Sequence, residues 1–146
     1  MILRPLTVFD AEMMAELEKL CFPLPWSLQA VQAELKNPIA LYIGAFVEGK
    51  LAGYAGMQVI LDEGYITNVA AAPEMRRRGI ADSLMTALMT AAEERKLSFV
   101  TLEVRESNTP AQNLYRKHGF SAVGKRKNYY DKPKEDAVLM TRRGIL

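Results

Sequence analysis

Two side chains in the second half of the sequence have the chemistry of a general base and a general acid. Glu103 stands in the otherwise apolar segment Thr101-Leu102-Glu103-Val104, and Tyr115 stands in a segment with helical character. A carboxylate can remove a proton from an attacking group, directly or through a water. A tyrosine hydroxyl can donate a proton to a departing group. Both residues also have ordinary interpretations, since Glu103 can face solvent and Tyr115 can be a core residue with a hydrated hydroxyl.

A basic turn between an expected strand and a long expected helix is a candidate phosphate site. The run Arg76-Arg77-Arg78-Gly79-Ile80-Ala81 follows the strand 65–71 and Pro73. The first amides of a helix lack intrahelical partners and attract anions, and Gly79 and Ala81 let a ligand approach the backbone closely. Neither a G-x-G-x-x-G fingerprint nor a P-loop is present, and three arginines in a turn can equally form a solvated surface.

The elements around these residues follow from hydrophobic periodicity and turn signals. Expected strands cover residues 2–4, 39–47, 51–61, 65–71, 98–104, 120–130 and 137–141; expected helices cover 10–20, 27–36, 79–95 and 109–118. This order predicts an α/β (α+β) fold with one mixed sheet. The strand–helix–strand crossovers 65–104 and 98–124 are expected to place their strands side by side and roughly parallel.

Local signals make three further predictions about the helices. In the helix 10–20, the apolar face is formed by Met13, Met14, Leu17 and Leu20. Ser27 is the predicted N-cap of the second helix. Thr109 is predicted to begin a capping box that ends at Gln112, with Pro110 as the first helical residue.

Composition bounds the class of protein. The chain of 146 residues is 49% hydrophobic and 25% charged, which predicts one globular domain over residues 1–146. The net charge of +2 argues against nucleic-acid binding by the whole surface, and we interpret the basic runs 125–127 and 142–143 as solvated. No signal peptide or apolar run of about 20 residues is recognisable, so we expect a cytoplasmic protein without membrane contact. With one cysteine, Cys21, and one histidine, His118, we expect no disulfide and no metal, and we interpret Cys21 as packing rather than as a nucleophile.

The basic turn resembles the acetyl-CoA signature [QR]-x-x-G-x-[GA] of the GCN5-related N-acetyltransferases (GNAT). It begins with Arg76 rather than Gln and ends with Ala81 rather than Gly, both within the pattern. The resemblance implies a mixed sheet of about seven strands with about four helices. It also implies that the loop amides of Arg76, Arg77, Arg78, Gly79, Ile80 and Ala81 hold the CoA pyrophosphate, and that Val69, Ala70 and Ala71 offer backbone bonds to the pantetheine arm and the acetyl carbonyl.

A second block is similar to one subfamily, the RimI-type ribosomal-protein-alanine acetyltransferases of bacteria. Residues 103–120 match its pattern E-V-R-x-S-N-x-x-A-x-x-L-Y-x-x-x-G-F at every fixed position. The resemblance implies that Glu103 is the general base, that Tyr115 is the general acid and that Asn108 contacts CoA. Similarity in the segments Phe22-Pro23-Leu24-Pro25-Trp26-Ser27, Asn128-Tyr129-Tyr130 and Glu135-Asp136-Ala137 implies an acceptor groove between Trp26 on one side and Tyr129 and Tyr130 on the other.

The expected reaction is direct transfer of acetyl from acetyl-CoA to the N-terminal α-amine of a protein. The subfamily resemblance implies as acceptor the N-terminal alanine of bacterial small-subunit ribosomal protein eighteen. Other protein N-termini, lysine side chains or a small amine remain alternatives, as does a CoA-binding interaction module without turnover. The expected partners are acetyl-CoA and a protein N-terminus, and a monomer is favoured.

Overall fold

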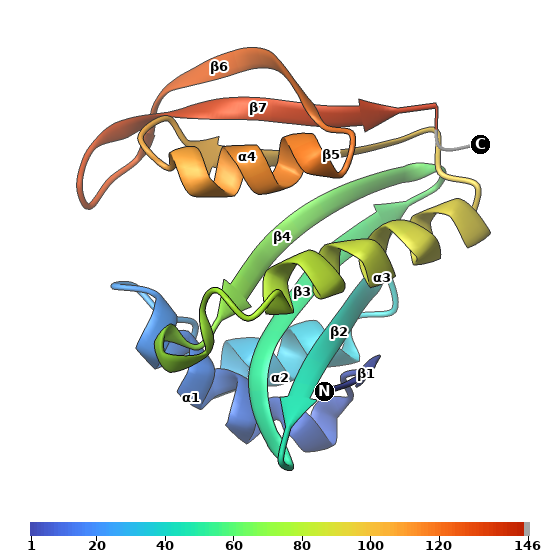
Figure 1. The fold of residues 1–146 in the computed structure, drawn as a ribbon, viewed down its shortest axis with the longest axis vertical. Helices are drawn as coiled ribbons and strands as arrows, with labels where there is room; N and C mark the ends of the chain where they lie inside the picture. The colour runs from blue at the N-terminus through green and yellow to red at the C-terminus, as the bar shows by residue number, and fades with distance from the viewer. Residues whose placement is uncertain (145–146) are drawn as a thin grey trace.

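The computed structural model describes residues 1–144, so the last two residues of the expected domain, 145 and 146, lie outside the described part (Figure 1). In chain order the elements are β1 (Ile2–Pro5), the 3-10 turn η1 (Val8–Asp10), α1 (Ala11–Cys21), α2 (Leu28–Lys36), β2 (Ala40–Val47), β3 (Lys50–Ile60), β4 (Glu63–Ala71), the 3-10 turn η2 (Pro73–Met75), α3 (Ile80–Glu94), β5 (Phe99–Arg105), α4 (Thr109–Lys117), β6 (Ser121–Tyr130) and β7 (Glu135–Arg143). Across residues 1–144 this gives seven strands and four α-helices, which confirms the predicted mixed fold. None of the helices in this range is both long enough and apolar enough to cross a membrane.

The strands form one sheet in the order β1-β2-β3-β4-β5-β7-β6. The first predicted crossover is confirmed, because β4 and β5 are neighbours and parallel with α3 between them in the chain. The second is wrong in its adjacency: β7 lies between β5 and β6 and is antiparallel to both. The reason is burial, since the apolar β7 is covered on both faces whereas β6 carries Lys125, Arg126 and Lys127 and is exposed almost throughout. A charged strand is suited to the edge of a sheet.

The join between β4 and β5 is short. Their paired residues are Glu63 with Phe99, Gly64 with Val100 and Tyr65 with Thr101. Immediately beyond this join β4 has a bulge, because Ile66 and Asn68 pair with consecutive residues of β3 and leave Thr67 extra. A bulge bends its strand and increases the local twist. The two strands therefore diverge, and Figure 1 shows β4 leaving the layer formed by β5, β7 and α4.

Two clusters of buried side chains cover the faces of the sheet. One lies under α3 and includes Ile80, Leu84 and Leu88, which recur with helical spacing; the other lies under α1 and α2. The predicted apolar face of α1 is partly wrong, because Met13 and Leu20 are 37% and 60% exposed. The buried residues of α1 are Ala11, Met14, Ala15, Leu17 and Glu18. The inward face thus includes a charged residue, which a search for apolar side chains alone does not find.

The helix caps correct one further detail. Ser27 is the N-cap of α2, as predicted, and its Oγ accepts a hydrogen bond from the amide of Ala30 (3.1 Å). The N-cap of α4 is Asn108 rather than Thr109, because the Asn108 Oδ1 accepts from the amide of Ala111 (3.2 Å). Asparagine is among the best N-cap residues. Gln112 does not close a capping box; its Nε2 donates to the carbonyls of Arg105 and Glu106 (3.1 and 2.9 Å).

Candidate active site

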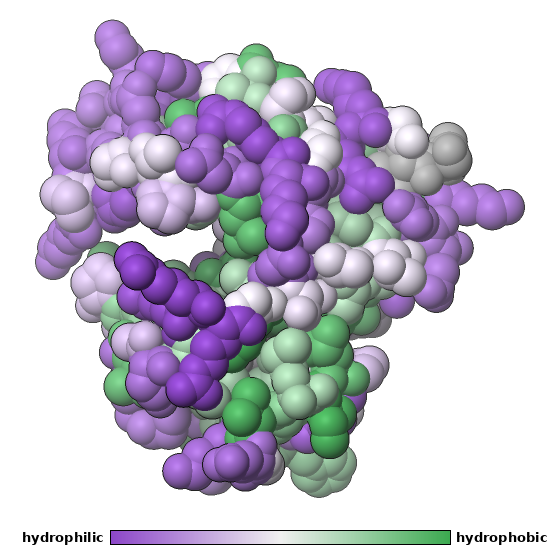
Figure 2. Space-filling model, in the orientation of Figure 1, coloured by the Kyte–Doolittle hydropathy of each residue, from purple (hydrophilic) through white to green (hydrophobic). Residues whose placement is uncertain are grey.

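A cavity of about 630 Å³ occupies the space where β4 and β5 diverge. We call its two sides the α1 wall and the β5 wall. The α1 wall consists of Glu18, residues 21–24, Trp26 and residues 66–69 of β4; the β5 wall consists of residues 102–105, Asn108, Ala111, Tyr115 and residues 129–133. Figure 2 shows an opening between the two layers of the molecule with hydrophilic side chains on its rim.

The cavity brings together seven of the fifteen site residues predicted from the sequence. Glu103, Tyr115, Asn108, Val69, Trp26, Tyr129 and Tyr130 all line it, although they come from segments far apart in the chain. Ala70, Ala71 and the loop 76–81 do not line it; they continue along β4 and into the start of α3. The predicted catalytic pair and the predicted acceptor residues therefore share one cleft.

Glu103 faces the cleft because residues alternate along β5. Its neighbours Leu102 and Val104 are buried in the core under α3, which sends the Glu103 side chain to the opposite face. The Glu103 Oε1 accepts from the Arg126 Nε (3.1 Å), and the two side chains are 26% and 53% exposed. Within residues 1–144 the Oε2 accepts no hydrogen bond. One carboxylate oxygen is thus held in place while the other can accept a proton.

Tyr115 combines the two interpretations of its sequence position. Its ring is buried against Phe120, with ring centroids 6.0 Å apart, and its side chain also lines the cleft. Burial, with a smaller contribution from Tyr130, raises the pKa of the Tyr115 hydroxyl to about 12. Since an ordinary tyrosine has a pKa near about 10, this phenol keeps its proton throughout the physiological range and can act as a donor.

The free edge of β4 borders the cleft. The amide of Ala72 donates to the carbonyl of Ala52 in β3 (2.8 Å). Bonding alternates along an antiparallel pair, so the peptide groups of Val69 and Ala71 point away from β3, toward the unpaired edge, and those of Ala70 point toward β3. The Ala71 carbonyl accepts from the Cys21 Sγ (3.3 Å). Polar backbone at such an edge can bind an extended ligand.

The basic loop leads from this edge into α3. Gly79 is the N-cap of α3 with φ of 76°, and it supplies no side chain to cap the helix. A Cβ at Gly79 would meet nothing within 4 Å, so the positive φ is what favours glycine there. Arg76, Arg77 and Arg78 are exposed around these first amides of the helix. The loop therefore has the uncapped amides and the countercharge that a phosphate needs.

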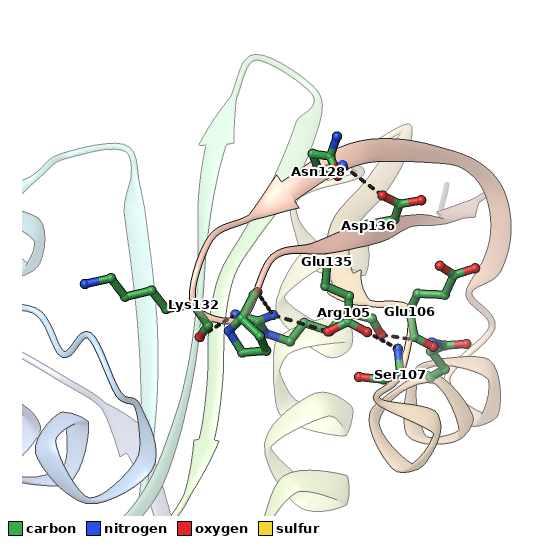
Figure 3. Close-up of polar contacts among 9 residues, drawn as sticks. Arg105, Glu106, Ser107, Asn128, Lys132, Glu135 and Asp136 are labelled. Carbon is green, nitrogen blue, oxygen red and sulfur yellow. Dashed lines mark hydrogen bonds and ion pairs between the residues drawn. The ribbon is translucent and has the colours of Figure 1, made fainter.

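Polar contacts hold the β6–β7 tip against the end of β5 and the turn that leads into α4 (Figure 3). The Arg105 guanidinium donates to the carbonyls of Pro133 (2.8 Å) and Lys132 (3.3 Å) and to the Glu135 Oε1 (3.2 Å). The Glu135 Oε2 accepts from the amide of Ser107 (2.6 Å), and bonding to Ser107 is the main reason that the pKa of Glu135 is lowered. Arg105 also lies over the ring of Tyr130, 4.3 Å from its centroid.

Cys21 and His118 could also do chemistry, but their surroundings argue against a role in the reaction. Cys21 lines the cleft, but burial raises the pKa of its thiol, which is the opposite of what activates a nucleophile. The His118 Nε2 contacts the Asp82 Oδ1 (2.9 Å), and His118 does not line the cleft. Within residues 1–144 no group of three His, Cys, Asp or Glu side chains could hold a metal ion.

The sequence interpretation missed Glu18. It is 1% exposed, lines the cleft and accepts hydrogen bonds from Tyr54, Asn68 and the amide of Trp26. A signal was present, because Glu18 follows Ala11, Met14 and Ala15 on one stripe of α1 with helical spacing. A charged residue on a buried stripe marks a polar contact inside the fold.

Comparison with known proteins agrees with this geometry. A sequence model described as the acetyltransferase (GNAT) family matches residues 11–120. A Bacillus subtilis relative is 38% identical over 94% of this chain and 91% of its own length. A Haemophilus ducreyi relative named [ribosomal protein bS18]-alanine N-acetyltransferase is 36% identical over 90% of this chain and 92% of its own length.

Solved structures show the same fold. The ribosomal-protein-S18-alanine N-acetyltransferase from Escherichia coli superposes with a TM-score of 0.91 and 30% identity, covering 97% of this chain and 92% of that one. Arabidopsis thaliana NAA60, solved with a bisubstrate analogue, has a TM-score of 0.85 at 19% identity and shares the fold over 97% of each chain. The expected family is confirmed: this chain belongs to the acetyltransferase (GNAT) family, whose members use acetyl-CoA as acetyl donor.

Proposed function

We propose that this protein transfers the acetyl group of acetyl-CoA to the N-terminal α-amine of a protein, and that the acceptor is the N-terminal alanine of ribosomal protein bS18. The observation that carries the proposal is the cleft itself, where an accessible carboxylate and a buried phenol face a free strand edge. The relatives from Haemophilus ducreyi and Escherichia coli that bear this activity in their names match most of this chain.

The residues present fit acetyl-CoA. We assign the peptide groups of Val69 and Ala71, which point away from β3, to the pantetheine arm and the acetyl carbonyl, with Ala70 completing the strand. The amides at the start of α3 and the arginines of the loop 76–81 would hold the pyrophosphate. Asn108 lines the cleft while its Oδ1 caps α4, which leaves its side-chain amide nitrogen for the cofactor. Acetyl-CoA supplies an acyl group activated as a thioester.

Glu103 and Tyr115 divide the proton transfers between them. As the amine nitrogen bonds to the thioester carbonyl carbon, the Glu103 Oε2 accepts a proton from that nitrogen, directly or through a water. As the carbon–sulfur bond breaks, Tyr115 donates its hydroxyl proton to the sulfur. Exchange with solvent then removes the proton from Glu103 and restores the one on Tyr115, so both groups return to their starting states.

The acceptor enters between the two walls of the cleft. Trp26 stands on the α1 wall, and Tyr129 and Tyr130 stand on the β5 wall, where their rings meet edge to face with centroids 5.0 Å apart. Aromatic side chains give a large contact area at low entropic cost. We assign these three residues to the first residues of the acceptor chain.

A thiol-release assay with acetyl-CoA tests the proposal. One acceptor is a hexapeptide with the N-terminal sequence of bS18; the other is the same peptide with its α-amine blocked and a lysine added. Release with the free α-amine only, and mass spectrometry that places the acetyl group on the first residue, is the expected result. Release with the blocked peptide only would replace the proposal by lysine acetylation. Binding of acetyl-CoA without release from either peptide would contradict the proposed acceptor.

A further inference from the structure

Glu18 is a buried carboxylate whose partners are all uncharged. Its Oε1 accepts from the amide of Trp26 (2.9 Å), and its Oε2 accepts from the Tyr54 hydroxyl and from the Asn68 Nδ2 (3.1 Å). The Asn68 Nδ2 also donates to the Tyr54 hydroxyl oxygen (3.1 Å). Among residues 1–144 no lysine, arginine or histidine forms an ion pair with Glu18.

Such a group is costly to bury. An ionised carboxylate loses its hydration inside a protein and is retained only where hydrogen bonds replace the water. Bonds to a charged acceptor are stronger than bonds between neutral groups, so each of the three donors is held firmly in place. Glu18 therefore fixes the positions of Trp26, Tyr54 and Asn68 relative to one another.

The three donors belong to segments with different tasks. Trp26 is in the irregular segment between α1 and α2 that forms part of the α1 wall. Asn68 is in β4, between the bulge at Thr67 and the free edge at Val69. The 22–26 segment has no helix or strand of its own and is tied to regular structure at its ends by α1 and α2. Through its bonds to Trp26 and Asn68, Glu18 therefore links the 22–26 segment directly to β4.

We infer that Glu18 is a positioning residue, which holds the 22–26 segment in a fixed position relative to β4. It therefore affects the affinity for the acceptor rather than the rate of the chemical step. The inference rests on the proposed function in so far as Trp26 contacts the acceptor. Glu18 itself is not assigned a proton-transfer role, because its two oxygens already hold three donors.

The variant Glu18→Gln removes the charge with little change in size. Its amide NH₂ cannot accept a hydrogen bond, so either the Trp26 bond is lost, or the Asn68 bond is lost and the Tyr54 hydroxyl has to accept instead of donate. The expected result is an acceptor KM raised about tenfold, the effect of one lost charge-assisted bond, with kcat and the KM for acetyl-CoA changed less than about twofold. Trp26 is the sole tryptophan, so its fluorescence reports on the segment directly, and acrylamide should quench it more strongly in the variant.

Two further variants separate positioning from general damage. Glu16→Gln alters an exposed carboxylate on the same helix and should leave both readouts unchanged. Glu18→Gln combined with Asn68→Asp moves the carboxylate from α1 to β4. The new glutamine nitrogen and the Tyr54 hydroxyl can then both donate to the new aspartate, while the glutamine oxygen can still accept from the amide of Trp26. This double variant should restore the quenching, and most of the acceptor KM, to wild-type values.

The outcomes are distinct for this inference and for the proposed function. Wild-type quenching and acceptor KM in a folded Glu18→Gln would overturn the inference, as would a loss confined to kcat. If Glu18→Gln does not fold, Tyr54→Phe, which removes one donor and leaves two, should raise both readouts by a smaller factor; no change would overturn the inference. If the wild type fails to acetylate the N-terminal peptide, the proposed function falls, while the quenching experiment still decides whether Glu18 holds Trp26.

Discussion

The two walls of the cleft are held by opposite kinds of polar contact. In the α1 wall, Glu18 is buried and bonds to the uncharged groups of Trp26, Tyr54 and Asn68. In the β5 wall, Glu103 pairs with Arg126 and Glu135 pairs with Arg105, and these side chains are partly exposed. Both walls therefore contain carboxylates that hold other groups in place. The carboxylate of the α1 wall is buried (dry) and is stabilised by uncharged hydrogen-bond donors, whereas those of the β5 wall are partly exposed to water (wet) and are paired with arginines.

This difference separates positioning from chemistry. A buried carboxylate whose two oxygens accept three hydrogen bonds cannot exchange protons with a ligand at low cost, but it fixes its neighbours. A partly exposed carboxylate with one free oxygen, as in Glu103, can take a proton and release it to solvent. Ion pairs at the surface contribute little stability and are screened by salt. High salt should therefore weaken the contacts of the β5 wall more than those of the α1 wall.

The largest effect is expected from Glu103→Gln. The substitution keeps the size and the contact with Arg126 but removes the proton acceptor, so kcat should fall by about two to three orders of magnitude. The affinity for acetyl-CoA, measured by calorimetry, should change less than about threefold, since the groups proposed to bind the cofactor lie elsewhere. A variant that keeps more than about half of the wild-type kcat would show that the reactive carboxylate is not in the β5 wall.

Tyr115→Phe should follow, with kcat reduced about a hundredfold and acetyl-CoA binding retained. Because burial raises the pKa of Tyr115 to about 12, its proton stays bound as the pH rises, and Tyr115 should impose no fall in kcat below about pH 11. The measurement is the pH profile of kcat from about pH 7 to 10.5. A wild-type decline near about pH 9 that is absent in Tyr115→Phe would contradict the buried environment of the phenol.

Much of the fold could be predicted because its signals are local. Ser27 caps α2 from its own segment, and the stripe Ile80, Leu84 and Leu88 needs only helical spacing. The place of β7 between β5 and β6 could not be predicted in this way. The crossover rule concerns strands that follow each other in the chain, whereas β7 pairs with β6 as a hairpin and also with β5, and so separates the two. Strand order depends on which strand needs cover on both faces.

The same distinction between local and long-range signals applies to the candidate site. Glu103 and Tyr115 stand in one continuous motif, and the cleft brings them together. The network of Glu18 was missed because Tyr54 and Asn68 lie 36 and 50 positions from it along the chain. No local pattern links three such residues, and helical propensity favours glutamate on any face of a helix. The apolar stripe of α1 could indicate that Glu18 is buried, but only the packing of α1 on β3 and β4 supplies its partners.

A third test concerns the tyrosine behind the α1 wall. Burial, and then the bond to Glu18, raise the pKa of Tyr54 far above that of the unfolded chain, which is near about 10. A raised folded pKa means that the folded state keeps a proton that the unfolded state loses, so stability present below about pH 10 is lost as the pH rises above it. Relative to Tyr54→Phe, the wild type should lose about 1.4 kcal/mol more of its unfolding free energy between about pH 8 and 11. Urea unfolding at both pH values measures this, and equal losses would mean that Tyr54 is not buried.

The smallest effect is expected from Arg105→Gln in the β5 wall. The guanidinium holds the carbonyls of Lys132 and Pro133 and the carboxylate of Glu135, so its loss should loosen the β6–β7 tip that carries Tyr130. Because these contacts are partly exposed, the acceptor KM should rise only about threefold at low salt, with kcat nearly unchanged. The difference from wild type should shrink in about 0.5 M NaCl, where the ion pair is screened, whereas the effect of Glu18→Gln should persist.

Arg116→Gln on the exposed face of α4 is the matched control. Equal salt dependence for both walls would refute the contrast between dry and wet carboxylates, and a larger effect for Arg105→Gln than for Glu18→Gln would reverse it.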